Sequence, residues 1–114
     1  MPLVPSKELV QTADVGKYAV GAFNAVNMES AQAIFAAAEQ ERSPLIIQVT
    51  QTTMDYTNPD ELVALIKVLA DRAKIPVALH LDHGRSFDLV MRFLKLGMTS
   101  VIRKSGRGRT VSVA

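Results

Sequence analysis

The chain has 114 residues, of which 48% are hydrophobic and 21% are charged, and this is the composition of an ordinary globular domain. The absence of cysteine excludes disulfide bonds, thiolate zinc sites and a cysteine nucleophile. No apolar run approaches the roughly 20 residues that span a bilayer. We therefore expect a soluble, cytoplasmic protein with no membrane partner.

The formal net charge of +2 is distributed unevenly along the chain. Residues 1–102 carry a net charge of −2, whereas residues 103–114 carry +4 and no acidic residue. This basic segment has no aromatic side chains of the kind that stack on nucleic-acid bases. A nucleic acid is therefore not the expected partner.

Apolar runs of strand length alternate with longer amphipathic segments, a pattern typical of βα units around a parallel sheet. In the first half of the chain, Ser6 is predicted to cap a helix that ends at Gly16. The run at 18–23 is predicted to be the first strand. Asn27 is predicted to cap a second helix, and the run at 45–49 to be the second strand.

The second half of the chain repeats this alternation. Asn58 is predicted to cap a third helix, with a proline at its first helical position, and the run at 77–81 is the expected third strand. Ser86 is predicted to cap a fourth helix, and Gly97 to end it before a fourth strand at 99–102.

An open doubly wound sheet and a closed barrel both use βα units. The sequence contains no glycine-rich phosphate-binding fingerprint, so we predict an α/β fold of the (β/α) TIM-barrel type with about its first four strands. Polar residues stand at or just after three predicted strands: Asn24, Thr50, Asp82 and His83. These positions converge on one face of a barrel, although strand ends are also polar simply because loops contact water.

The run His80-Leu81-Asp82-His83-Gly84 is the strongest candidate for a metal-binding or acid–base site, because it contains both histidines of the chain and an aspartate. The imidazole of His83, at the strand exit, suits a zinc ion, and Asp82 can act as a general acid and base beside it. Side chains alternate along a regular strand, so the two histidines cannot both bind one metal there. We expect His80 to be buried and hydrogen-bonded instead.

Four segments in the same order closely resemble class II, zinc-dependent ketose-bisphosphate aldolases, chiefly fructose-1,6-bisphosphate aldolase. They are GKYAVGAFN (16–24), SPLIIQVT (43–50), VALHLDHG (77–84) and GMTSV (97–101). The resemblance covers residues 1 to about 102. It implies a βα barrel that cleaves a ketose 1,6-bisphosphate into dihydroxyacetone phosphate and a triose phosphate aldehyde. Fructose 1,6-bisphosphate is the first candidate, and tagatose 1,6-bisphosphate, which differs at C4, is the alternative.

The resemblance also implies a role for each matching residue. His83 matches a ligand of Zn²⁺ or another divalent cation, and Asp82 matches the acid and base that acts on the C4 hydroxyl of the sugar bisphosphate. Asn24 matches a substrate-contacting asparagine. Thr50 stands where a phosphate-contacting serine is usual, which keeps the hydroxyl and adds a methyl group.

The family likeness stops after residue 102, and a complete barrel needs about 250 residues. We interpret 1–102 as the N-terminal half of an aldolase barrel and 103–114 as an unrelated basic tail, disordered or produced by a frameshift. With one imidazole for zinc, the isolated chain is expected to be inactive. The alternative is a non-enzymatic half-barrel binding module whose basic tail contacts a polyanion.

The first and fourth strands are expected to be unpaired edges of the sheet. Exposed edges invite association, so a homo-oligomer or self-associating chain is expected.

The frameshift hypothesis can be tested on the coding DNA. If it is right, another reading frame downstream of residue 102 encodes a barrel continuation with further histidines. A downstream region that encodes no such continuation in any frame would contradict the hypothesis.

Overall fold

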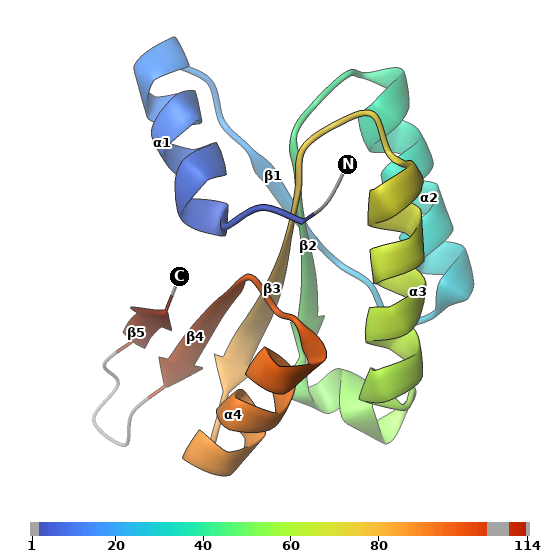
Figure 1. The fold of residues 1–114 in the computed structure, drawn as a ribbon, viewed down its shortest axis with the longest axis vertical. Helices are drawn as coiled ribbons and strands as arrows, with labels where there is room; N and C mark the ends of the chain where they lie inside the picture. Colours follow the sequence, from blue (N-terminus) through green and yellow to red (C-terminus); the bar gives the residue numbers. More distant parts are fainter. Residues whose placement is uncertain (1–2, 105–109, 114) are drawn as a thin grey trace.

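A computed structural model describes residues 3–104 and 110–113 of the chain. In chain order the elements are α1 (Ser6–Gly16), β1 (Gly21–Asn24), α2 (Met28–Gln40), β2 (Leu45–Thr50), the 3-10 helix η1 (Gln51–Asp55), α3 (Pro59–Arg72), β3 (Val77–Gly84), α4 (Phe87–Leu96), β4 (Ser100–Lys104) and β5 (Thr110–Val113). The strands form one sheet in the order β1-β2-β3-β4-β5 (Figure 1). Strands β1 to β4 are parallel, which confirms the predicted α/β fold.

The helices begin and end at residues that satisfy their terminal backbone groups. Asn27 and Ser30 form a reciprocal capping box at α2, with Asn27 Oδ1 accepting from the Ser30 N–H at 2.8 Å. Ser86 caps α4 by accepting from the Leu89 N–H, and Gly97 ends that helix with a φ of 103°. Among the described residues, no helix is both long and apolar enough to cross a membrane.

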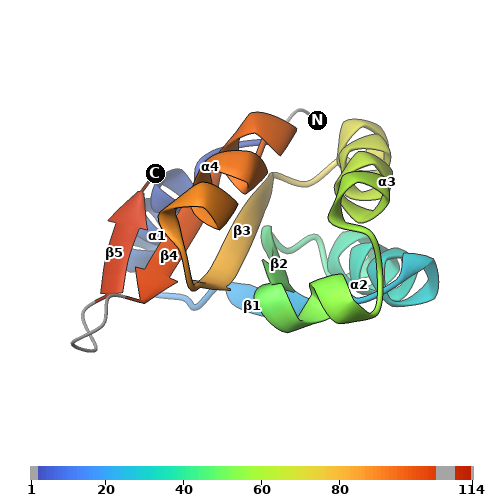
Figure 2. The same cartoon turned by 90° about the horizontal axis from the view of Figure 1, so that it is seen from below.

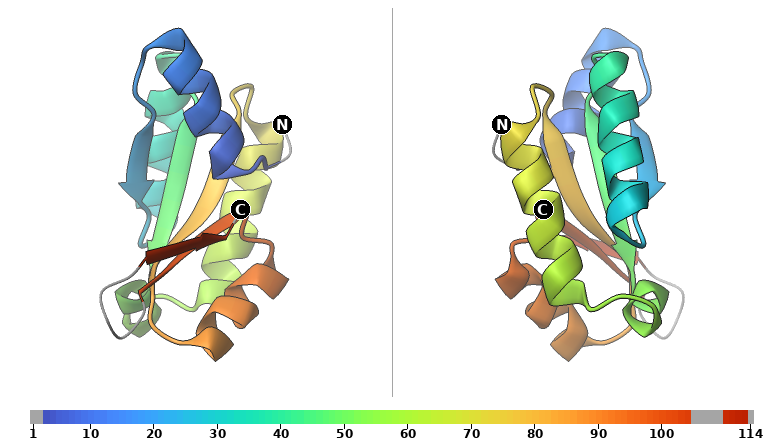
Figure 3. Two further views of the ribbon diagram at one scale, coloured as in Figure 1. Left: turned by 90° about the vertical axis from the view of Figure 1, so that its left-hand side faces the viewer. Right: turned by 90° about the vertical axis from the view of Figure 1, so that its right-hand side faces the viewer.

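The main core lies between one face of the sheet and the helices α2, α3 and α4. Alternate residues of the two central strands point into it and are almost completely buried: Leu45, Ile47, Val49, Val77, Leu79 and Leu81. The right panel of Figure 3 shows α2 and α3 covering this face, which we call the outer face. These alternating apolar residues fix the register of the sheet, because a slip by one residue would turn them toward the opposite face.

Helix α1 covers part of the opposite face, which we call the inner face (Figure 3, left panel). Leu9 of α1 packs there against Ile46 of β2 and Ala78 of β3. The view from below in Figure 2 shows α1 and the α2–α3 pair on opposite sides of the sheet. The sheet therefore lies between α1 on the inner face and α2, α3 and α4 on the outer face.

Hydrogen bonds from partly buried Ser6 through buried Ser100 to buried His80 connect α1 to the inner face. The Ser6 hydroxyl lies 2.5 Å from the Ser100 hydroxyl, which lies 2.6 Å from Nδ1 of His80. His80 is only 6% exposed, which confirms the expectation of a buried, hydrogen-bonded histidine. Ser6 was expected to cap α1, but Pro5 occupies the cap position and no side chain caps it. The Ser6 side chain pairs with β4 instead.

The first strand is shorter than predicted. Its pairing with β2 begins at Gly21 and Leu45 rather than at residue 18. Strand β2 begins directly after Pro44, so residues before Gly21 have no parallel partner in the sheet. Strands β3 and β4 run beyond their predicted ends, to Gly84 and Lys104.

The prediction that the fourth strand is an unpaired edge is wrong. Strand β5 pairs antiparallel with β4, in the register Val101 to Val113 through Lys104 to Thr110. Strand β5 falls within the segment expected to be a basic tail, and its run Thr-Val-Ser-Val is rich in β-branched residues that favour strands. Residues 105–109 and 114 of the tail lie outside the described residues.

The burial of His80 predicts that acid destabilises the fold. Burial lowers the pKa of His80 below its ordinary value of 6.5, and the nearby charge of Asp82 partly opposes this effect. The unfolded chain therefore takes up a proton at a higher pH than the folded chain. The free energy of unfolding should fall as the pH drops below 6.5, by at most about 1.4 kcal/mol per pH unit.

Urea unfolding between pH 8 and 5.5 measures this effect. The His80→Gln variant should lose most of the pH dependence in this range, whereas His83→Gln, at an exposed position, should keep it. A wild-type free energy of unfolding that stays constant from pH 8 to 5.5 would contradict the prediction.

Candidate active site

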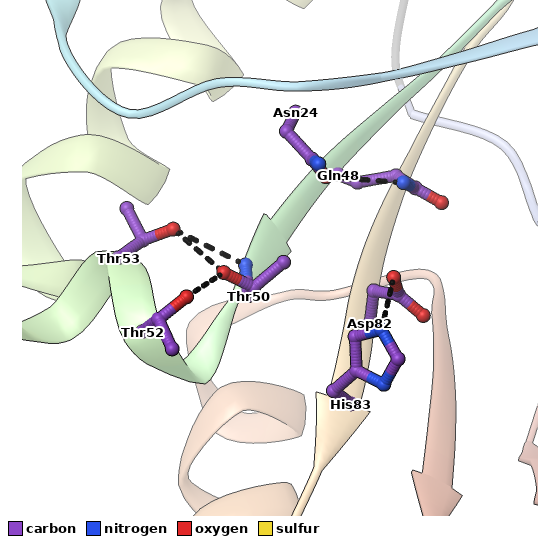
Figure 4. A network of polar contacts seen from close by, with 7 residues as sticks. All are labelled: Asn24, Gln48, Thr50, Thr52, Thr53, Asp82 and His83. Atoms are coloured by element: carbon purple, nitrogen blue, oxygen red, sulfur yellow. Dashed lines mark hydrogen bonds and ion pairs between the residues drawn. The ribbon is translucent and has the colours of Figure 1, made fainter.

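The candidate site forms where β1, β2 and β3 reach their carboxyl ends. The parallel register places Thr50, the last residue of β2, opposite Asp82 of β3. In the same register Asn24, the last residue of β1, lies opposite Gln48. Three of the four residues proposed from the sequence therefore lie at the carboxyl ends of neighbouring strands, and His83 directly follows Asp82 (Figure 4).

Asp82 and His83 form the most closely associated pair in this group. Nε2 of His83 lies 3.2 Å from Oδ2 of Asp82, and Figure 4 shows the ring turned toward the carboxylate. The side chain of Asp82 is 23% exposed and that of His83 is 66% exposed. Both side chains are therefore open to a ligand at the surface of the described structure.

The backbone at His83 explains how neighbouring residues can face each other. His83 has a φ of 57°, in the left-handed region that residues other than glycine rarely adopt. The register between β3 and β4 also shifts between Leu81 and Gly84. The regular alternation assumed from the sequence does not extend to His83, because this irregularity redirects its side chain toward Asp82.

Thr50 belongs to a cluster of hydroxyl groups that the sequence reasoning missed. Its Oγ1 lies 2.8 Å from Oγ1 of Thr52 and 3.0 Å from Oγ1 of Thr53. Thr53 also accepts a hydrogen bond from the backbone N–H of Thr50 and is only 5% exposed. The Thr-x-Thr-Thr spacing at the end of a strand could have predicted this cluster, because a short turn brings hydroxyl groups at such spacings together.

The side chain of Asn24 is hydrogen-bonded to a residue of β2. Nε2 of Gln48 donates to Oδ1 of Asn24 at 3.1 Å. This bond leaves the amide NH₂ of Asn24 available as a donor to a ligand. Gln48 was not singled out from the sequence, although its place two residues before Thr50 puts it on the same face of β2.

The described residues offer only part of a metal site. No group of three or more His, Cys, Asp or Glu side chains gathers among them in a way that could hold a metal ion. The imidazole of His83 fits a single ligand position, whereas catalytic zinc sites generally use three protein ligands. The described part of the chain does not form a complete metal centre by itself.

Comparison with known protein families gives one assignment that covers most of the chain. Residues 4–104 match the family model described as fructose-bisphosphate aldolase class-II. Two curated relatives illustrate the similarity. The chain is 44% identical over 101 residues to the fructose-bisphosphate aldolase of Helicobacter pylori strain J99, covering 88% of this chain and 33% of the relative. It is 40% identical over 105 residues to the 6-phospho-5-dehydro-2-deoxy-D-gluconate aldolase of Halalkalibacterium halodurans, covering 90% and 36%.

A solved structure supports the same relationship at the level of the fold. The crystal structure of the YdjI aldolase from Escherichia coli K12 superimposes with a TM-score of 0.87 at 28% sequence identity. The match covers 92% of this chain and 40% of that chain. The chain thus spans about a third of the length of the curated relatives it matches. From this agreement of sequence and fold, we conclude that the chain belongs to the class II fructose-bisphosphate aldolase family.

Proposed function

We propose that the residues of this chain serve the reversible, zinc-dependent aldol cleavage of a ketose 1,6-bisphosphate. The products are dihydroxyacetone phosphate and a triose phosphate aldehyde. The observation that carries the proposal is the register of β2 and β3, which sets the hydroxyl residue Thr50 opposite the carboxylate Asp82 at the carboxyl ends of the strands. The active sites of (β/α) barrels are built at these ends.

Asp82 is the proposed general base and acid. In the cleavage direction its carboxylate takes the proton of the C4 hydroxyl, the C4 oxygen forms the aldehyde, and the C3–C4 bond breaks. The electron pair of that bond remains with the ketone half as an enediolate, which is then protonated to dihydroxyacetone phosphate. The partial exposure of Asp82 lets its carboxylate reach a substrate from the open end of the sheet.

His83 is the proposed ligand of a divalent cation, zinc first among them. When bound, such a cation acts as a Lewis acid that stabilises negative charge on substrate oxygens. The further ligands would come from segments present in the longer relatives, because the described residues supply no complete ligand set. The left-handed backbone at His83 turns the imidazole out of the strand, where it is accessible.

Thr50 and Asn24 are the proposed substrate contacts. The Thr50 hydroxyl can donate to a phosphate oxygen while its contacts with Thr52 and Thr53 restrict where it points. Asn24, held by Gln48, can donate from its amide NH₂ to a substrate oxygen. Charged phosphate oxygens make such hydrogen bonds stronger than those between neutral groups.

Fructose 1,6-bisphosphate is the proposed substrate. The relatives named fructose-bisphosphate aldolase reach 45% identity, compared with 40% for the 6-phospho-5-dehydro-2-deoxy-D-gluconate aldolase and 38% for a sulfofructosephosphate aldolase. All three names denote the cleavage of a phosphorylated sugar derivative.

A chimeric enzyme tests the role of Asp82. Residues 4–104 of this chain would replace the matching segment of the H. pylori aldolase, which supplies the rest of the barrel. The chimera should release triose phosphate from fructose 1,6-bisphosphate in a coupled assay, and a chelator should stop it. Asp82→Asn should lower kcat by about 10² to 10⁴, the usual contribution of a general base.

The matched control is Asp14→Asn, which makes the same chemical change on the exposed side of α1. This variant should keep the activity of the unmodified chimera. A folded chimera without cleavage activity would contradict the proposed function. An Asp82→Asn chimera as active as the Asp14→Asn chimera would contradict the proposed role of Asp82.

The role of Thr50 predicts a loss of substrate affinity when its hydroxyl is removed. In the same chimera, Thr50→Val keeps the shape of the side chain and should raise KM by about 10 to 100-fold, the value of a hydrogen bond to a charged group. Thr50→Ser keeps the hydroxyl and should restore a KM near that of the unmodified chimera. Equal KM values for the Val and Ser variants would show that the hydroxyl does not contact the substrate.

A further inference from the structure

Three hydroxyl groups gather at the carboxyl end of β2, those of Thr50, Thr52 and Thr53, and we call them the hydroxyl cluster. Thr50 is the last residue of β2, and the other two belong to η1. Oγ1 of Thr50 lies within hydrogen-bonding distance of both neighbours, at 2.8 Å from Thr52 and 3.0 Å from Thr53. The proposed function assigns a role only to Thr50, so the other two hydroxyl groups have no role yet.

Thr53 is the buried member of the hydroxyl cluster. It is only 5% exposed, and its Oγ1 accepts a hydrogen bond from the backbone N–H of Thr50 at 3.4 Å. A buried hydroxyl group needs an acceptor for its own proton, and Oγ1 of Thr50 lies 3.0 Å away. The Thr53 hydroxyl therefore donates to the Thr50 oxygen, and the proton of Thr50 points elsewhere.

The hydroxyl cluster has one proton more than its internal contacts use. Three hydroxyl groups carry three protons, and the two contacts between their oxygens take up two of them. The third proton belongs to Thr50 or to Thr52, depending on which of the two donates to the other. Because Thr52 is exposed, this donor can reach a ligand. A negatively charged oxygen attracts it most, since hydrogen bonds to a charged acceptor are about twice as strong as those between neutral groups.

Hydrogen bonds between loops hold the hydroxyl cluster beside the other proposed substrate contact, Asn24. Oγ1 of Thr57, in the segment after η1, donates to the carbonyl of Val26 at 2.5 Å. The N–H of Ala25 donates to the carbonyl of Gln48 at 2.9 Å. The loop after β1 is thus tied both to β2 and to the segment that follows the cluster. Donors that are held in place before a ligand arrives lose little conformational freedom when they bind it.

The surrounding charges leave room for an anion at the hydroxyl cluster. In Figure 4, Thr52 and Thr53 lie on the opposite side of Thr50 from Asp82 and His83. An anionic group held by Thr50 and Thr52 therefore lies away from the carboxylate that is proposed to move the proton. Asp55, at the end of η1, is exposed, so solvent screens its charge.

We propose that Thr52 is a second contact for a phosphate group of the substrate, and that Thr53 is a positioning residue for the hydroxyl of Thr50. Thr53 donates to Thr50, and Thr50 and Thr52 each donate to an oxygen of one phosphate group. Binding replaces a neutral hydrogen bond inside the cluster with bonds to a charged group. The inference rests on the proposed function, because the phosphate is that of the ketose bisphosphate.

The chimeric enzyme described above tests the contact made by Thr52. Thr52→Val should raise KM at least about tenfold, the value of a hydrogen bond to a charged group, and should leave kcat nearly unchanged. Thr52→Ser keeps the hydroxyl and should restore KM. The matched control is Thr12→Val, which makes the same change at an exposed position of α1. Thr12 lines a groove with Pro44 and Pro76, at the amino ends of β2 and β3, and its variant should keep KM.

The same substitutions in a Thr50→Val chimera separate a direct contact from a positioning role. Thr52→Val should raise KM further in this background, because Thr52 has its own bond to the phosphate. Thr53→Val should raise KM in the unmodified chimera and have no further effect beside Thr50→Val, because Thr53 acts only through the Thr50 hydroxyl. Thr53→Ser should restore KM in the unmodified chimera.

Several results would overturn the inference. The contact of Thr52 is wrong if its Val variant raises KM by less than about tenfold, as expected for a bond between neutral groups, or no more than Thr12→Val does. It is also wrong if Thr52→Val has no effect beside Thr50→Val. A further rise from Thr53→Val in that background contradicts the positioning role. An inactive chimera contradicts the proposed function itself, whereas these results in an active chimera contradict only the roles of Thr52 and Thr53.

Discussion

The in-register pairing of β2 with β3 is the interaction on which the rest of the structure depends. Six consecutive residue pairs join the two strands, from Leu45 and Val77 to Thr50 and Asp82. The outer-face residues of both strands are almost completely buried beneath the helices, so a slip of one residue would expose an entire apolar face. The cost of that exposure, at about 25 cal/mol per Å² of apolar surface, makes the register unique.

The same register creates the candidate site. Side chains alternate between the two faces of the sheet, so the register that buries Val49 and Leu81 on the outer face sets Thr50 beside Asp82 at the carboxyl ends of β2 and β3. Helix α1 then anchors the inner face through Ser6, Ser100 and His80. Core packing and site geometry are thus two consequences of one strand pairing. The chain matches the family model over residues 4–104, although it spans only about a third of the length of its relatives.

Features that depend on neighbouring residues in the chain could be predicted from the sequence. The caps Asn27 and Ser86, the stop at Gly97 and the burial of His80 follow from local patterns, and the structure confirms them. Membership of the aldolase family could also be predicted from the sequence, because four segments resemble the family and occur in the same order.

Features set by distant contacts or by unusual backbone geometry could not be predicted. The pairing of β5 with β4 is a contact between strands, and the β-branched run that forms β5 does not by itself specify its partner. The left-handed backbone of His83 and the contact of Ser6 with Ser100 across 94 residues have no local signal. The roles of Asn24, Thr50, Asp82 and His83 stay predictions.

The most direct test of the central claim is a nuclear Overhauser spectrum of the 114-residue chain in solution. The account predicts cross-strand contacts between backbone protons at both ends of the pairing, near Leu45 and Val77 and near Thr50 and Asp82. Contacts displaced by one or more residues, or their absence in a folded chain, would contradict the register and the site that depends on it.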